Sequence, residues 1–118
     1  MSVDRDWLVG ELRASLSALA SPGSEALATV PDGFAKADEL AIDYGNFVSA
    51  VLGNFGDEFS TEQTAVLRRI DAMLEAMSGA ENAELWTEEA VVSHPRWQEV
   101  RKAARVALNR LGWNEDAS

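Results

Sequence analysis

The chain has 118 residues, 47% of them hydrophobic and 25% charged, and 20 acidic side chains against 10 basic ones give a net charge of −10. This length suits one domain with one core, residues 1–118, and the composition is that of a folded globular protein. The lack of cysteine excludes disulfides, thiolate metal sites and a catalytic thiol, while the negative charge disfavours nucleic acids and anionic membrane surfaces as partners.

The opening residues 4–20 predict an amphipathic helix. Leucines recur at helical spacing on one face, at Leu8, Leu12, Leu16 and Leu19, with Trp7 beside them as an expected core residue. The tripeptide at 21–23, serine, proline and glycine, ends this helix. A short helix over 24–29 is then expected, with Ser24 as its N-cap.

The segment 34–52 predicts a second long helix. Its apolar positions keep one register straight through Gly45, which marks a bend or a close helix contact; they are Ala37, Leu40, Ala41, Tyr44, Phe47, Val48, Val51 and Leu52. The sequence at 53–56, Gly-Asn-Phe-Gly, is interpreted as a helix stop followed by a turn.

The third helix has the clearest boundaries. Ser60 and Gln63 have the spacing of a capping box, in which each side chain satisfies an exposed amide of the other residue, and Gly79 is expected to close the helix. Between them runs a continuous apolar stripe of Val66, Leu67, Ile70, Met73, Leu74 and Met77.

The last two predicted helices meet at the only histidine. Thr87 is expected to cap a short helix over 87–92, and Pro95 disfavours helical geometry at His94 while suiting the first turn of a final helix over 96–111. His94 is therefore interpreted as a cap or turn residue; the alternative is a pH-sensitive contact. Trp97 is expected to lie in the core.

Together these elements predict an all-α protein, a compact bundle of four main helices with one or two short extra helices. No catalytic, metal-binding or cofactor-binding constellation is expected, because there is a single histidine and no glycine-rich phosphate loop follows a strand. An enzyme is disfavoured. The acidic N-terminus and the lack of a membrane-length apolar run favour a cytoplasmic protein.

The expected partner site is an acidic cluster with one aromatic residue, formed by Glu81, Glu84, Trp86, Glu88 and Glu89. A helix over this stretch would align three of the glutamates on one face, and an exposed Trp86 would supply an interface anchor. The alternative is a solvated face that only keeps an acidic protein of bacterial type soluble. A second acidic cluster comprises Asp38, Glu39 and Asp43.

The predicted function is that of a small acidic protein-binding module, of the inhibitor or immunity type, that blocks a basic partner. One alternative is a helical small-ligand-binding or enzyme domain whose pocket is lined by Phe47, Met73, Met77 and Trp97 with His94 at its mouth. Another is a homodimeric structural protein, so the chain is expected to be a monomer or a homodimer. The basic residues of the final helix, Arg96, Arg101, Lys102, Arg105 and Arg110, are expected to pair with the acidic body.

Overall fold

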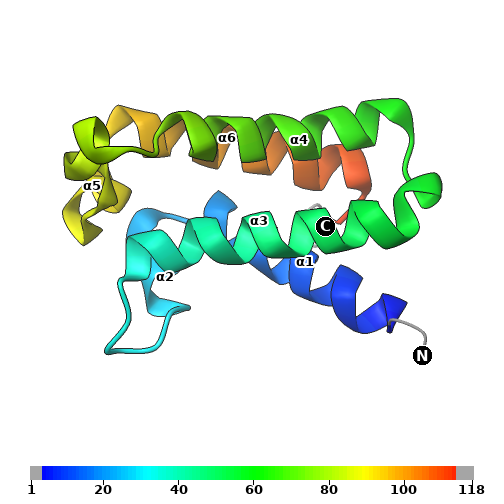
Figure 1. The fold of residues 1–118 in the computed structure, drawn as a ribbon, viewed down its shortest axis with the longest axis horizontal. Coiled ribbons are helices and arrows are strands. Elements are labelled where there is room, and N and C mark those ends of the chain that lie inside the picture. The colour runs from blue at the N-terminus through cyan, green and yellow to red at the C-terminus, as the bar shows by residue number, and fades with distance from the viewer. Residues whose placement is uncertain (1–3, 114–118) are drawn as a thin grey trace.

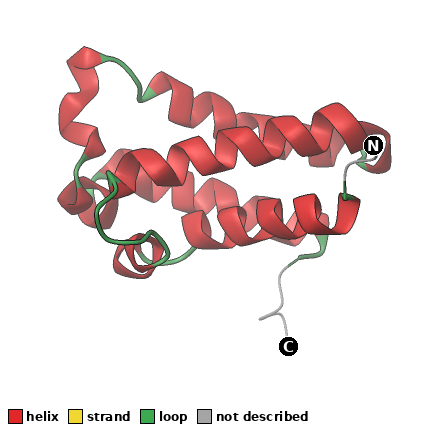
Figure 2. Cartoon of the chain, turned by 60° about the horizontal axis from the view of Figure 1, so that its bottom comes forward, coloured by secondary structure: helices red, strands yellow, loops and turns green. Residues whose placement is uncertain are grey.

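The chain forms a helical bundle, described over residues 4–113 in a computed structural model. The long helices are α1 (Arg5–Ala20), α3 (Lys36–Phe55), α4 (Thr61–Ala76) and α6 (Pro95–Leu111), and the short ones are α2 (Gly23–Ala28), α5 (Glu88–Ser93) and two 3₁₀ segments, η1 (Gly56–Glu58) and η2 (Ala80–Trp86) (Figure 1). The structure is 83% helical, and residues 4–113 contain no strand (Figure 2). The prediction of an all-α bundle with four main and two short helices is confirmed.

The four long helices run alternately up and down, so that neighbours are antiparallel (Figure 1). Helix α1 packs against both α3 and α6, and α6 packs against α4. The fourth pair, α3 and α4, makes fewer contacts than the other three neighbouring pairs. The bundle is therefore closed on three sides and looser between α3 and α4.

Local side-chain chemistry fixes where the helices begin. Ser60 Oγ accepts from the amide of Gln63 over 3.0 Å, and the Gln63 side chain accepts from the amide of Ser60 over 2.9 Å, which confirms the predicted capping box. Thr87 caps α5 as predicted, by accepting from the amide of Ala90. Asp4 likewise caps α1 through the amide of Trp7.

His94 closes one helix and opens the next, as predicted. Its backbone amide donates to the Ala90 carbonyl at the end of α5, and its Nδ1 accepts from the amide of Arg96 over 3.0 Å at the start of α6. Pro95 occupies the first position of α6, where its missing N–H costs no hydrogen bond. The cap accounts for the position of this histidine between the two helices.

Several predicted boundaries are wrong. Helix α3 continues through Gly53 and ends at Phe55, because Leu52 and Phe55 pack against the core and outweigh the helix penalty of the glycine. Helix α4 ends at Ala76, and Gly79, with φ of 108°, precedes η2 instead of closing α4. Helix α2 starts at Gly23, without a side-chain cap from Ser24.

The core lies where the leucine, valine and tryptophan stripes of the long helices meet. Its most deeply buried large side chains are Leu12, Leu16, Tyr44, Val51, Leu67, Ile70, Met77, Val91 and Val100. Trp97 is buried as predicted, and its indole Nε1 donates to the Leu85 carbonyl over 2.7 Å. Over residues 4–113, no helix combines the length and the apolar character needed to cross a bilayer.

Candidate functional site

The predicted cluster of glutamates is exposed but is not arranged as expected. Glu81 and Glu84 lie on η2, whereas Glu88 and Glu89 lie in the first turn of α5. A helical alignment of the first three glutamates is wrong, because the 80–86 segment is a kinked 3₁₀ turn and Thr87 is extended. The four carboxylates instead lie on two separate short elements in the connection between α4 and α6.

Trp86 is not the exposed aromatic residue that the sequence suggested. Its indole Nε1 donates to the Met77 carbonyl over 2.8 Å, and its ring meets that of Trp97 edge to face, with centroids 5.5 Å apart. Trp86 is therefore half-buried and held in place by two contacts.

The exposed tryptophan is Trp7, so its predicted place in the core is wrong. It is 56% exposed and meets only the edge of Phe47 among aromatic rings, with centroids 6.1 Å apart. Trp7 lies in the first turn of α1, just past the Asp4 cap, where it touches the side of α3 without being enclosed.

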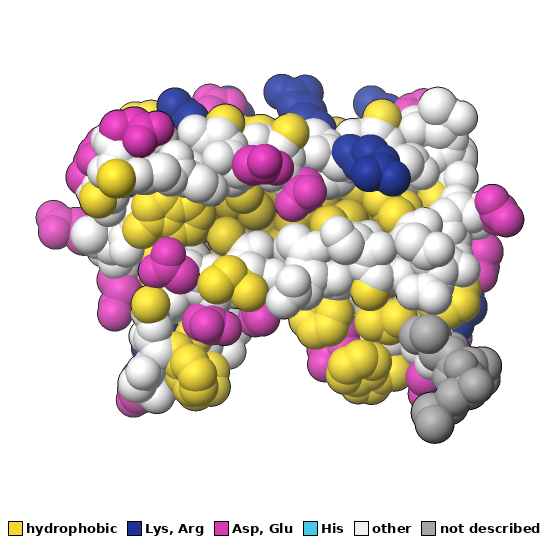
Figure 3. Space-filling view, in the orientation of Figure 1, with side chains coloured by type: hydrophobic (Ala, Val, Ile, Leu, Met, Phe, Trp, Pro, Cys, Tyr) yellow, Lys and Arg dark blue, Asp and Glu magenta, His cyan; other side chains and the backbone are white. Residues whose placement is uncertain are grey.

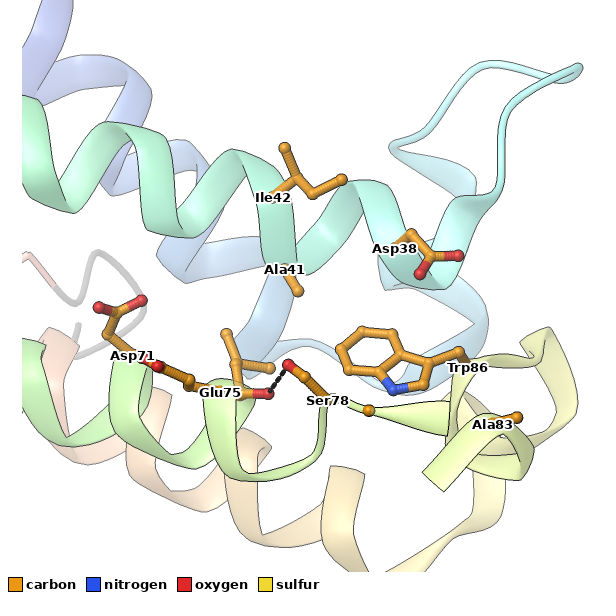
Figure 4. Close-up of a pocket in the computed structure, with 10 residues that line it drawn as sticks. Asp38, Ala41, Ile42, Asp71, Glu75, Ser78, Ala83 and Trp86 are labelled. Carbon is orange, nitrogen blue, oxygen red and sulfur yellow. Dashed lines mark hydrogen bonds between the residues drawn. The ribbon is translucent and has the colours of Figure 1, made fainter. Parts of the chain in front are cut away.

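A groove opens between α3 and α4, where the bundle is loosest, and we call it the α3/α4 groove. It is lined by residues from 38–42 of α3, by residues from 71–75 of α4 and by Ser78 and Gly79 just after α4. Ala83 and Trp86 close it at one end, and it holds about 540 Å³. Figure 4 shows Ala41 directed toward α4, Ile42 directed away from α4 in this view, and the Trp86 indole projecting between the two helices. The floor is apolar and includes Leu74.

Every charged side chain that lines the α3/α4 groove is acidic. Asp38 lies in the first turn of α3, where the helix dipole favours it, and Asp71 and Glu75 follow one face of α4. Ser78 adds a hydroxyl group, which donates to the Leu74 carbonyl over 3.3 Å (Figure 4). The geometry therefore combines an apolar floor with a negative rim, which suits a ligand that is apolar and cationic.

One residue of the sequence could have indicated this groove, although it is not part of the predicted apolar stripe. Ile42 falls outside the apolar register of the predicted 34–52 helix, and it is 51% exposed in the structure. Such a residue indicates a contact surface only where a groove lies beside it. The groove beside Ile42 results from the loose packing of α3 against α4 and cannot be seen in either helix alone.

The predicted methionine and aromatic pocket is not assembled. Met77 and Trp97 are core residues, 1% and 3% exposed, and neither lines the α3/α4 groove. Phe47 borders a separate small hollow between α1 and α3, of about 240 Å³, and His94 is occupied with its cap. Within residues 4–113, no group of three potential ligands is placed to hold a metal ion.

The predicted pairing of the basic residues of α6 with the acidic body is found at Arg110, whereas Arg101 and Arg105 bind backbone carbonyls instead. Arg101 and Arg105 donate to the carbonyls of Ser21 and Ala20, over 2.8 and 3.0 Å, at the end of α1. Arg110 does pair with a carboxylate, that of Glu62 on α4. Two of the basic side chains thus cap α1, whose last carbonyls have no partner within the helix.

Comparisons of the chain with protein-family models, with curated proteins and with solved structures found no match.

Proposed function

We propose that this chain is a small acidic protein-binding module, of the inhibitor or immunity type, which engages a basic partner protein through the α3/α4 groove. The observation that carries the proposal is the composition of the groove, an apolar floor with a charged lining that is entirely acidic at the Trp86 end. The exposed glutamates at positions 81, 84, 88 and 89 extend the negative surface beyond the groove.

The two features support different aspects of binding. Burial of the exposed half of the Ile42 side chain contributes about 1 kcal/mol to association, before the cost of ordering the partner. The net charge of −10 attracts a cationic partner over distances up to the screening length and raises the association rate. Carboxylates presented in this way occupy the place of phosphate groups on a basic nuclease or toxin, which is how an inhibitor of this kind acts. The lack of cysteine suits a reducing, cytoplasmic setting for the pair.

The proposal is tested with a pair of charge-reversal variants. Glu75→Lys changes the rim of the groove, and because Glu75 is exposed near the end of α4, a lysine there is compatible with the helix dipole. Glu99→Lys makes the same change at an exposed position of α6 that does not line the groove, and it serves as the control.

The immobilised wild-type chain and both variants are exposed to extract from the native source, and retained proteins are identified and then purified for calorimetry. We expect a basic protein that binds the wild type and Glu99→Lys alike, and binds Glu75→Lys at least ten times more weakly. Equal affinities for all three chains would show that the groove is not the binding site.

The surrounding glutamates have a separate test. Simultaneous charge reversal of Glu84, Glu88 and Glu89 is expected to slow association with that partner and to flatten its salt dependence. Unchanged kinetics would mean that these three side chains form only a solvated face. Light scattering at several concentrations distinguishes the homodimer alternative, because a monomer at all concentrations excludes it.

A further inference from the structure

The α3/α4 groove continues past the acidic hollow. A second hollow of about 170 Å³ lies further along the same two helices, lined by Val48, Ser49, Leu52, Gly53, Arg68 and Asp71. Asp71 lines both hollows, so they adjoin each other, and we call the two together the channel; its lining on α3 extends from Asp38 to Gly53. At a rise of 1.5 Å per residue this stretch of α3 is about 22 Å long.

The side of α3 that lines this channel includes the small side chains of Ala41, Ser49 and Gly53 among larger ones, namely Asp38, Ile42, Val48 and Leu52. Ala41, Gly45, Ser49 and Gly53 follow one another at intervals of four residues. A β-carbon built on Gly45 would lie 3.6 Å from Asp71 Oδ1, and one built on Gly53 would meet nothing within 4 Å. The hollows therefore leave room for the backbone of a partner to approach α3 closely.

The charge along the channel is more negative at one end than at the other. Asp38 and Glu75 line only the hollow beside Trp86, Asp71 lines both hollows, and Arg68 lines only the far one. Figure 3 shows this order on the molecular surface, with a band of hydrophobic side chains between α4 and α3, acidic groups along its left and centre, and a basic group above its right half. A ligand whose two ends differ in charge should therefore bind along the channel in one preferred orientation.

We infer that the channel receives an α-helix of the basic partner, about 15 residues long, with its basic end beside Trp86 and its acidic or neutral end beside Arg68. The inference rests on the proposed function and identifies the part of the partner that the groove binds. A helix fits because the backbone groups of α3 and α4 are already paired within their own helices. An extended segment would find no backbone partners there, while a helix satisfies its own.

The probe is a synthetic 16-residue amphipathic helix with a leucine stripe, lysines flanking the stripe in one half and glutamates flanking it in the other. Its affinity is measured by fluorescence anisotropy. We expect saturable binding by the wild-type chain, and at least tenfold weaker binding of a peptide with proline at its centre, because proline breaks the helix. Equal affinities of the two peptides would overturn a helical ligand.

Filling the channel should block the peptide without harming the fold. Gly53→Leu places a side chain in open space on an exposed stretch of α3 and is expected to weaken binding at least tenfold. Gly10 is an exposed residue of α1, and a β-carbon added there would meet nothing within 4 Å. Gly10→Leu is therefore the matched control and should bind as the wild type does. Thermal melting of both variants verifies that they are folded. If Gly53→Leu melts as a folded protein and binds normally, the channel is not the site.

The orientation of the bound peptide is measured by disulfide capture. The natural chain contains no cysteine, so only the introduced cysteine can react. Ser78→Cys marks the acidic end of the channel and Ser49→Cys the other end. A peptide with cysteine at its basic end should be captured about ten times faster by Ser78→Cys, and one with cysteine at its acidic end by Ser49→Cys. Equal rates would overturn the orientation.

The outcomes separate this inference from the proposed function. If the partner protein binds the groove but neither the peptide nor any helix of the partner does, the helical ligand is wrong and the binding module stands. Sedimentation of the chain alone tests the alternative that a second copy of the chain occupies the channel. A dimer that Gly53→Leu dissociates would show that the channel is filled by the chain itself and would overturn the inference.

Discussion

The guanidinium group of Arg101 donates through Nε to the backbone carbonyl of Ser21 over 2.8 Å, across 80 residues of sequence. The same group donates to the Val91 carbonyl over 3.2 Å and to the Gln98 side chain. Arg101 is 8% exposed, and its burial lowers the pKa of the guanidinium, with a further contribution from the charge of Arg105. One buried cation thus joins the end of α1, the α5 segment and α6.

Replacement of Arg101 by leucine should therefore cost about 2–4 kcal/mol of unfolding free energy. Leucine fills part of the volume but leaves the carbonyls of Ser21 and Val91 without their partner, and each buried unpaired group costs about 1–3 kcal/mol. Lysine would not restore the loss, because it lacks the planar fork of donors. Urea denaturation measures the change, and Lys102→Ala, on the exposed side of α6, should stay within about 0.5 kcal/mol. Equal effects at both positions would contradict the joining role of Arg101.

Gly23→Ala should be among the most disruptive small substitutions in the chain. A β-carbon at Gly23 would lie 2.5 Å from Val92 Cα and 2.7 Å from the Val91 carbonyl oxygen. These are backbone atoms of α5, so neither can move aside cheaply, and α2 and α5 must separate. We expect a loss of about 1–3 kcal/mol, measured by thermal or urea unfolding.

Gly10→Ala provides the matched comparison. Gly10 lies within α1 and is exposed, and a β-carbon added there would meet nothing within 4 Å, so alanine only raises helix propensity. We expect a gain of about 0.5–1 kcal/mol. A loss at Gly10, or a gain at Gly23, would show that helix contacts do not determine the response to these substitutions.

Substitutions at His94 test whether it is only a cap. His94→Asn keeps a side-chain acceptor for the Arg96 amide and should change stability by less than about 1 kcal/mol, whereas His94→Ala should cost about 0.5–2 kcal/mol. Both values come from urea denaturation at neutral pH. A loss of several kcal/mol in His94→Asn would indicate a role beyond the cap.

The features that sequence predicted correctly depend on short-range chemistry. The Ser60 and Gln63 capping box and the His94 cap join groups three or fewer residues apart, so the pattern alone specifies them. Most residues of the predicted stripes are buried, because their spacing follows from 3.6 residues per turn, and others, such as Phe47, Val66 and Met73, are half-buried against the core. Helix ends at glycine were less predictable, since tertiary packing of Phe55 carries α3 past Gly53.

The candidate site depended on contacts that no local pattern contains. Trp86 looked like an exposed anchor because it lies among glutamates, but its indole reaches the Met77 carbonyl across a non-helical turn. Trp7 looked like a core residue because it adjoins the leucine stripe, yet more than half of its surface stays exposed. The groove lies where α3 and α4 pack less closely than the other neighbouring long helices, and this looseness depends on the packing of the whole bundle.

The only tyrosine of the chain, Tyr44, should contribute to a measurable loss of folding stability at alkaline pH. Tyr44 is fully buried, and its hydroxyl group donates to the Leu67 carbonyl on α4 over 2.7 Å. Burial raises the pKa of this phenol well above its ordinary value, and the charge of Asp71 raises it further. The folded protein therefore keeps the proton of Tyr44 where the unfolded chain would release it.

The sign of the pH dependence follows from this difference. A group whose pKa is higher in the folded state contributes full stability below its unfolded pKa, about 10 for tyrosine, and loses it as the pH rises above that value. We expect the free energy of unfolding to fall above pH 10 by up to about 1.4 kcal/mol per pH unit through this residue. Tyrosinate absorbance should appear only together with loss of helical circular dichroism. Tyr44→Phe removes this contribution and should flatten the alkaline decline, while its lost hydrogen bond costs about 0.5–1.5 kcal/mol at neutral pH. Gradual titration of Tyr44 in a chain that remains fully helical would contradict the burial of its hydroxyl group.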